Sequence, residues 1–337
     1  MKYLITGGAG FIGSYLASSL LRDGHQVHVF DNLSTGEPEN IQSLSEYKGF
    51  RSTIADIRDY HAVEQAVSEC DQVIHLAASV GVKKVMEQAV ETLTTNVLGT
   101  EYVLRLAAIY RKKVFLASSS EVYGKVQGNK GLLSEDDDGR LGPTSGRRWG
   151  YACSKAMDEF LAFAYHQERE LPVVIGRFFN VVGAVQSPRQ KGEYGKVLPR
   201  FIDRAVNGKP LLVYGDGAQV RSFTHISDVV RAIRLLMDTP AAVGEVFNIG
   251  NHSEISIQKL AEKIIRLTGS RSQIKNVPHE EVYGIGFEDI DRRTPDLTKI
   301  QNTIDYEPQF SINEILNEVI AEYYRGDDTM GRAVGNN

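Results

Sequence analysis

A glycine-rich stretch near the N-terminus, Gly7-Gly-Ala-Gly10-Phe-Ile-Gly13, constrains this chain more than any other part of its sequence. It follows a buried-strand pattern over residues 2–6 and opens a helical pattern over residues 11–22. Glycines three residues apart between a strand and a helix let the backbone turn tightly and approach a pyrophosphate, which the helix N-terminus then faces. The stretch therefore predicts a βαβ unit that binds a dinucleotide.

An acidic residue at the end of the next predicted strand supports this interpretation. That strand covers residues 26–30 and ends at Asp31. A carboxylate at this point accepts hydrogen bonds from the adenosine ribose hydroxyls and repels a 2′-phosphate. The residue therefore favours NAD over NADP, whereas a glycine turn used only for packing would leave Asp31 unexplained.

The alternation of strand and helix patterns continues along the first half of the chain. Further strands are predicted near residues 50–55, 72–77, 112–117 and 172–177, with helices near 59–69, 88–109 and 150–168. Such alternation predicts a Rossmann fold, an α/β doubly wound parallel sheet whose ligands bind at the carboxyl ends of the strands. At those ends we expect Asp56 and Ile57 beside the adenine, and the small Ala77 and Ala78 beside the cofactor.

Tyr151 and Lys155 are four residues apart in a predicted helix and therefore lie on one face, one turn from each other. A free phenol titrates near pH ~10, so a proton acceptor at neutral pH needs its pKa lowered by ~3 units. A neighbouring ammonium, helped by a cationic nicotinamide ring, is a source of that lowering. An ordinary amphipathic helix carries the same spacing by chance, and the preceding fingerprint favours the catalytic interpretation. Ser119, at the end of the predicted strand over residues 112–117, aims a hydroxyl at the same space.

After about residue 180 the pattern loosens, and glycine and proline recur between shorter elements. We therefore expect an NAD-binding domain over residues 1–180, to which some later segments return, and a smaller C-terminal α/β substrate-binding portion over 181–325. The last predicted helix covers about 311–324, and the polar residues 326–337 are expected to form a mobile tail.

The totals exclude several classes of protein. The 337 residues carry a formal net charge of -5, which leaves no basic face for nucleic acid. No run approaches the ~18 apolar residues of a membrane span. The two cysteines form neither a disulfide framework nor a zinc set. We expect a cytoplasmic protein with no metal, no nucleic-acid partner and no membrane partner.

Together these motifs resemble the extended short-chain dehydrogenase/reductases that modify nucleotide sugars. The resemblance implies NAD-dependent oxidation at the sugar C4′, with Tyr151 as base, to a 4-keto intermediate. The motifs in family order over about residues 1–325 are Gly7-x-x-Gly10-x-x-Gly13, Asp31, Asn96, Ser119, Tyr151-x-x-x-Lys155, Arg177-Phe-Phe-Asn180, Tyr214-Gly-Asp-Gly, Arg221 and Phe247-Asn-Ile-Gly250.

Within that family, two segments are similar to UDP-glucuronate decarboxylases: Ser118-Ser-Ser-Glu-Val-Tyr-Gly124 and Arg293-Thr-Pro295. The run from residue 283 to 295 resembles the decarboxylase domain of the aminoarabinose pathway, and Arg147-Arg-Trp149 fits the same subgroup. Dehydratases typically carry an Asp-Glu pair where this chain has Ser120-Glu121, which disfavours elimination. The resemblance favours decarboxylation of UDP-glucuronate to UDP-xylose or a UDP-4-keto-pentose.

One departure keeps 4-epimerisation of a UDP-hexose or UDP-uronate as the alternative: the loop Ser79-Val-Gly-Val-Lys-Lys-Val85 is closer to epimerases. A second departure concerns the sugar-phosphate contacts, because the segment from residue 183 to 190 lacks the usual Gly-Pro-Arg run. A non-catalytic binding protein is a third hypothesis, which the intact Tyr151 and Lys155 disfavour.

The resemblance also implies the site residues. Catalytic roles are implied for Tyr151, Lys155, Ser119, Glu121 and Arg293, the last two at the carboxylate and the C5 proton. Substrate contacts are implied for Ser120, Asn180, Val197, Leu198, Tyr214, Arg221 and Lys83. Cofactor contacts are implied for Gly7, Gly10, Phe11, Ile12, Gly13, Asp31, Asn32, Asp56, Ile57, Leu76, Ala77, Ala78, Asn96, Tyr151 and Lys155.

Apolar residues also follow the predicted helices near 94–109 and 151–168, for example Leu104 and Phe160. In the family that the chain resembles, such helices pair across a two-fold axis, so we expect a homodimer through a four-helix interface. Burial of these residues against the sheet is the alternative use of the same surface.

Overall fold

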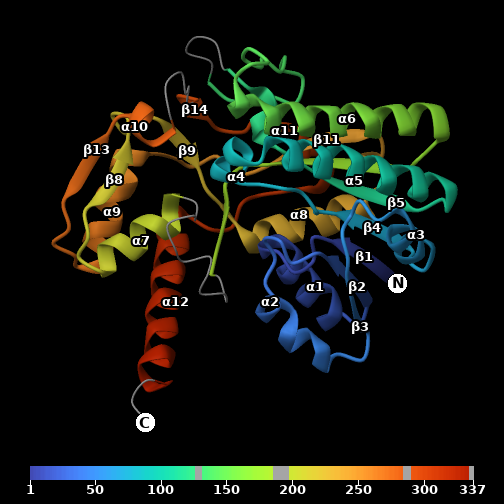
Figure 1. Ribbon diagram of the computed structural model, residues 1–337, viewed down its shortest axis with the longest axis horizontal. Coiled ribbons are helices and arrows are strands. Elements are labelled where there is room, and N and C mark those ends of the chain that lie inside the picture. The colour runs from blue at the N-terminus through green and yellow to red at the C-terminus, as the bar shows by residue number, and fades with distance from the viewer. Residues whose placement is uncertain (126–130, 185–196, 284–289, 334–337) are drawn as a thin grey trace.

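A single parallel sheet of seven strands organises the chain in a computed structural model, which describes residues 1–125, 131–184, 197–283 and 290–333 (Figure 1). The strand order is β11-β6-β5-β4-β1-β2-β3. The order reverses between β1 and β4, which is where a doubly wound sheet opens a crevice for a ligand. The strands are β1 (Lys2–Thr6), β2 (Gln26–Asp31), β3 (Phe50–Ile54), β4 (Gln72–His75), β5 (Lys113–Ser119), β6 (Val173–Phe178) and β11 (Glu245–Ile249).

Helices cover both faces of this sheet because successive strand side chains point to opposite faces. Leu4 packs in the core beneath α3, α5 and α6, and its neighbour Ile5 packs in the core beneath α1 and α8. These helices are α1 (Phe11–Arg22), α3 (Tyr60–Ser68), α5 (Ala89–Ile109), α6 (Gly150–Arg169) and α8 (Ile226–Asp238). Shorter ones are α2 (Glu39–Gln42), α4 (Val82–Glu87) and α11 (Thr298–Ile304). The expected fold class, including the cofactor-type helix Phe11–Arg22, is confirmed.

The C-terminal portion has its own apolar core, built from Phe201, Leu260 and Leu316 on three different helices. Two small sheets complete it, the parallel pair β13-β8 and the three-stranded sheet β12-β9-β14. The elements are α7 (Val197–Val206), β8 (Leu211–Tyr214), β9 (Val220–Ser222), β12 (Glu254–Ser256), α9 (Ile257–Thr268), β13 (Ile274–Val277), α10 (His279–Tyr283), β14 (Arg292–Arg293) and α12 (Ile312–Ala333). The pair β7 (Val181–Val182) and β10 (Thr224–His225) joins the two portions.

The closing helix is longer than expected. The sequence predicts an end near Tyr324 and a mobile tail from residue 326, whereas α12 continues to Ala333. The extension contains glycine but no proline, so it weakens the helix without removing a backbone donor. Figure 1 shows α12 projecting from the C-terminal portion. Among the helices in the described ranges, none is long and apolar enough to cross a membrane.

Candidate active site

The glycine fingerprint forms a cradle at the carboxyl end of β1 that side chains would fill. Gly7 has a positive φ of 69°, and a Cβ on it would lie 2.7 Å from the backbone nitrogen of Ala77. A Cβ on Gly13 would lie 2.4 Å from the carbonyl oxygen of Gly7. Both positions therefore require glycine, and the turn is shaped for the close approach of a pyrophosphate at the start of α1. The residues present fit a dinucleotide.

Asp31 is anchored to the same cradle. Its Oδ2 accepts a hydrogen bond from the backbone N–H of Ala9 at 3.0 Å, and its Oδ1 accepts one from Leu33 at 2.8 Å. Burial raises the pKa of this carboxyl, while the two backbone donors lower it. The carboxylate is thus held at the end of β2, beside the fingerprint, as the sequence predicts for a ribose contact.

The residues expected beside the adenine are held by neighbouring side chains. Arg58 donates two hydrogen bonds to Asp56, 2.8 Å from Nε to Oδ1 and 2.7 Å from Nη2 to Oδ2. These contacts lower the pKa of the Asp56 carboxyl to about 2. Asn32 also donates to Asp56 at 3.4 Å. Ile57 is buried against Gly99 of α5, so its packing is fixed from behind.

Asn96 is buried and connects two elements of the site through hydrogen bonds. It is 1% exposed, accepts a hydrogen bond from the backbone N–H of Ser79 at 2.7 Å and donates to Ser154 Oγ at 3.0 Å. Ser154 in turn donates to the carbonyl oxygen of Tyr151. Asn96 therefore connects the end of β4 to the turn of α6 that carries the tyrosine. The residues that follow β4, Leu76, Ala77 and Ala78, are half-buried beside the crevice.

Tyr151, Lys155 and Ser119 meet at the carboxyl end of β5. Tyr151 is half-buried in the first turn of α6, and Lys155 is buried on the next turn. The Ser119 hydroxyl interacts with the phenol, and its oxygen also accepts a hydrogen bond from the backbone N–H of Glu121. The spacing of these residues in the sequence thus becomes a cluster in space.

The electrostatics of Tyr151 differ from our expectation in the protein alone. Burial raises the pKa of the phenol, and this outweighs the lowering by Lys155 and Ser119, while Glu121 raises it further. The neighbouring ammonium is therefore insufficient by itself to ionise the phenol.

Glu121 lies between two arginines from distant parts of the chain. Its Oε2 accepts from Arg148 Nη1 at 2.6 Å, and its Oε1 pairs with Arg293 Nη1. Burial would raise the pKa of Glu121, but Arg293 and Arg148 outweigh burial and hold it at about 2. All three side chains are at most 15% exposed. Arg148, in the 3₁₀ turn Arg147–Trp149 before α6, is absent from the predicted site, although the similarity of Arg147-Arg-Trp149 to decarboxylases was the signal for it.

Other predicted residues follow β6 in the chain, and two of them, Asn180 and Arg221, lie at this cluster. The Asn180 Oδ1 accepts from Arg293 Nη2 at 3.3 Å, and Asn180 adopts an unusual positive φ of 34°. Arg221 lies beside Arg293, because the parallel pairing of β9 with β14 places the two residues opposite each other. Tyr214 at the end of β8 stacks under the guanidinium of Arg200, 4.2 Å from its ring centre.

Other predicted substrate residues are placed differently or lie outside the description. Leu198 is fully buried in the C-terminal core, so its side chain packs the helix rather than facing a ligand. Val197 packs against the same core, and Ser120 is 2% exposed. The side chain of Lys83 and the segment 185–196 lie outside the described residues.

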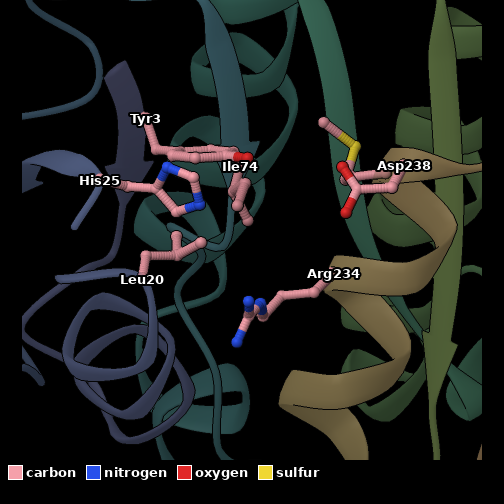
Figure 2. A pocket seen from close by; sticks show the side chains of 7 residues that line it. Tyr3, Leu20, His25, Ile74, Arg234 and Asp238 are labelled. Atoms are coloured by element: carbon pink, nitrogen blue, oxygen red, sulfur yellow. The ribbon is translucent and has the colours of Figure 1, made fainter. Parts of the chain in front are cut away.

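A small cavity of about 20 Å³ lies far from this cluster (Figure 2). It is lined by Tyr3 and His25, at the amino ends of β1 and β2, and by Arg234 of α8. It has room for about one water molecule and lies at the amino ends of β1 and β2, away from the carboxyl ends of the strands that carry the cluster. The chemistry of this protein is therefore not located there.

The fold and the site together define a class. A glycine cradle at β1, an acid at the end of β2 and a Tyr-Lys pair on α6 are the marks of a Rossmann-fold dehydrogenase/reductase. The family model described as GDP-mannose 4,6 dehydratase matches residues 4–319, and the chain belongs to this family.

Two similar relatives are named as decarboxylases of UDP-linked sugars. The chain is 44% identical to a UDP-N-acetyl-alpha-D-glucosaminuronate decarboxylase of Bacillus cytotoxicus, over 95% of this chain and 96% of the relative. It is 35% identical to UDP-glucuronic acid decarboxylase 1 of Xenopus tropicalis, over 96% of this chain and 72% of the relative.

Solved structures are similar over nearly the whole chain. A dTDP-glucose 4,6-dehydratase of Streptomyces venezuelae with NAD bound has a TM-score of 0.85 and 30% identity, over 97% of this chain and 98% of that one. A UDP-glucuronic acid 4-epimerase of Bacillus cereus, in complex with a fluorinated UDP-glucuronic acid and NAD, has a TM-score of 0.85 and 28% identity, over 96% and 99%.

Proposed function

We propose that this protein is an NAD-dependent decarboxylase of a UDP-linked uronic sugar, acting through a 4-keto intermediate. The observation that carries the proposal is the Arg148-Glu121-Arg293 cluster beside Tyr151. It concentrates two buried guanidinium groups where the chemistry of a sugar carboxylate requires positive charge. The decarboxylases among the relatives support the same reaction, and UDP-glucuronate and its 2-acetamido analogue are the candidate substrates.

In this mechanism Tyr151 accepts the proton of the sugar 4′-hydroxyl, and Ser119 orients that oxygen. When bound, NAD supplies the acceptor for the hydride that leaves C4′. The resulting C4 ketone and C6 carboxylate make a β-keto acid, which loses CO₂ and leaves an enolate. Lys155 and the two arginines place positive charge around the developing oxyanion, a contribution of several kcal/mol to the barrier.

Glu121 acts first as a charge that orients both arginines, because its pKa near 2 keeps it ionised at neutral pH. Its expected role at the C5 proton requires substrate binding to weaken the two ion pairs. Asn180 and Arg221 are proposed to face the diphosphate, and the fingerprint residues with Asp31 to hold the dinucleotide.

The test is incubation of the purified protein with NAD and either UDP-uronate, followed by mass spectrometry and measurement of CO₂. If the hydride returns to C4′, we expect a UDP-pentose lighter than the substrate by one CO₂, with no net NADH. If the UDP-4-keto-pentose is released, we expect a product lighter by one CO₂ and two hydrogen atoms, with one NADH formed. A product of unchanged mass with inverted C4 configuration would instead establish the epimerase, the activity of the similar Bacillus cereus protein.

Two neighbouring arginines provide a matched pair for the site assignment. Arg148→Gln removes one partner of Glu121 and is expected to abolish CO₂ release. Arg147→Gln changes an exposed arginine in the same turn, whose guanidinium donates to the carbonyl oxygen of Met86, and should leave turnover unchanged. Equal activity of the two variants would remove Arg148 from the site.

We further propose a homodimer through α5 and α6, which pack side by side (Figure 1). Large apolar side chains remain exposed along these helices, with Val90 at 80% and Phe160 at 72%. A second copy would cover them and form a four-helix interface.

Both cysteines are free thiols, Cys70 buried and Cys153 exposed, which fits the reducing cytoplasm that we propose as the location of the protein.

A further inference from the structure

A buried carboxylate that the proposed mechanism does not use lies beneath the catalytic lysine. Asp158 is on α6, 0% exposed, and its Oδ2 accepts a hydrogen bond from Lys155 Nζ at 3.1 Å. Its Oδ1 makes no hydrogen bond of ordinary geometry within the described residues. The Lys155 ammonium is the group that balances the Asp158 charge, so the two charges depend on each other.

A line of buried polar side chains continues from this ion pair across the sheet. Burial raises the pKa of Asp158, and the rise is opposed by Lys155 and by the Thr100 hydroxyl of α5, which interacts with the carboxylate. Thr100 Oγ1 lies 3.1 Å from His75 Nε2, and His75 Nδ1 lies 2.7 Å from Thr6 Oγ1. Thr6 Oγ1 accepts from the backbone N–H of Ala77 at 3.2 Å. Each of these side chains is at most 3% exposed.

The donors in this line can all point the same way. Burial and the nearby Lys155 lower the pKa of His75 to about 3, so its ring is neutral and carries one N–H. The ionised Asp158 is the strongest acceptor for the Thr100 proton, so Thr100 accepts from His75 Nε2–H. His75 Nδ1 is then an acceptor, and Thr6 donates to it. The line runs from the strand end at Ala77, beside the cofactor cradle, to the carboxylate under Lys155.

We propose that Asp158 is a positioning residue that holds the Lys155 ammonium charged and aimed at Tyr151, through a buried polar line that joins α6 to the strand ends of the cofactor cradle. This inference rests on the proposed function for Tyr151 as a base, but not on which UDP-sugar is the substrate. A buried ion pair is often replaceable by apolar residues without loss of stability, so its stability alone does not account for it.

The physical reason lies in burial. Burial favours the neutral amine of Lys155, and Asp158 opposes it and raises the pKa of the ammonium. A neutral amine would not stabilise a phenolate, so Asp158 preserves the charge that Tyr151 needs. Its negative charge also raises the pKa of Tyr151 directly. Removing that charge therefore weakens proton binding at both groups.

Asp158→Asn removes no other charge around the pair, so the remaining charged and titratable groups do not reverse the expected lowering of the pKa of Lys155 and of Tyr151. They are Glu121 after β5, Arg148 before α6, Arg293 on β14, Glu159 on α6 and His75 on β4.

The test is the pH profile of kcat/KM for Asp158→Asn, measured with any UDP-sugar that the wild-type protein converts. Both limbs of the profile are expected to move to lower pH, by about one unit or more. The control is Glu135→Gln, which also removes a buried carboxylate, one that accepts from the Asn248 backbone and contacts neither Lys155 nor Tyr151. Its profile should match the wild-type profile. A superimposable Asp158→Asn profile would overturn the proposal.

Two further measurements keep the test decisive. If Asp158→Asn fails to fold, Thr100→Val should lower kcat with an unchanged KM, because valine lacks the hydroxyl that interacts with Asp158. Thr100→Ser keeps that hydroxyl and should retain the wild-type kcat. Equal rates for Val and Ser would reject the line. If the wild-type protein converts no UDP-sugar, the function proposal has failed separately. The same downward shift is then sought in the phenolate absorbance of Tyr151, as the difference from Tyr151→Phe, and its absence would reject the role of Asp158.

Discussion

At the scale of single residues, the proposed chemistry depends on one phenol that the protein does not ionise unaided. Burial and Glu121 raise the pKa of Tyr151, and Lys155 and Ser119 lower it. The same interior that excludes water from the reaction therefore works against the base, and the charges around it decide the balance.

Tyr151→Phe removes the proton acceptor and keeps the ring. We expect kcat to fall by about 10²–10⁴-fold, the usual contribution of a general base, with an unchanged melting temperature. Tyr165→Phe on the same helix, whose hydroxyl contacts Glu101, is the control and should retain full activity. A Tyr151→Phe enzyme with wild-type turnover would show that another group takes the proton.

Glu121→Gln leaves two buried arginines without their shared counter-charge. We expect a loss of about 3 kcal/mol in the free energy of unfolding at neutral pH, measured with urea. The folded pKa of about 2 lies below the ordinary value of 4.5, so this contribution is complete above pH 4.5 and disappears as the pH falls toward 2. The variant and the wild type should therefore converge in acid. A constant difference across that range would contradict the ion-pair assignment.

At the scale of elements, the βα turn after β1 was the most predictable feature, because its requirements are local. The turn needs glycine where a Cβ would strike the backbone, and the helix Phe11–Arg22 follows from its own apolar pattern. The Arg148-Glu121-Arg293 cluster was less predictable. Two of its members are separated by 172 residues, and no local pattern records that β14 pairs with β9. The side chain of Leu198 was hard to place for a related reason, since an apolar residue at a helix start fits a core and a ligand pocket equally well.

Gly13→Ala tests the cradle. The new Cβ would lie 2.4 Å from the carbonyl oxygen of Gly7, so α1 must shift away from the turn. We expect a destabilisation of about 1–3 kcal/mol and weaker NAD binding, measured by thermal unfolding and calorimetry. Gly131→Ala, where a Cβ meets open space, is the control. Unchanged NAD affinity in Gly13→Ala would contradict the assigned pyrophosphate site.

At the scale of the whole molecule, the paired helices α5 and α6 pack on the sheet with one side and expose apolar residues on the other. Their inner sides pack against the sheet, with Leu104 and Ala162 fully buried, while Phe160 remains 72% exposed. Both uses that we considered for this surface are therefore compatible, because different residues of the same helices serve them.

Phe160→Glu places a charge at the centre of the proposed interface. We expect a monomer by analytical ultracentrifugation where the wild-type protein is a dimer, with the fold retained. Leu235→Glu, at a residue of α8 that is 38% exposed, should leave the oligomeric state unchanged. A wild-type monomer, or a dimer that survives Phe160→Glu, would place the interface elsewhere or remove it.

The sequence by itself determined the alternation of strands and helices, the dinucleotide turn and the Tyr-Lys pair, because each depends on residues close together in the chain. Only the tertiary structure decided that Glu121 lies between Arg148 and Arg293, and that Asp158 lies under Lys155 at the end of a buried polar line. Charge interactions depend on distance and burial, and folding sets both for residues that the sequence separates.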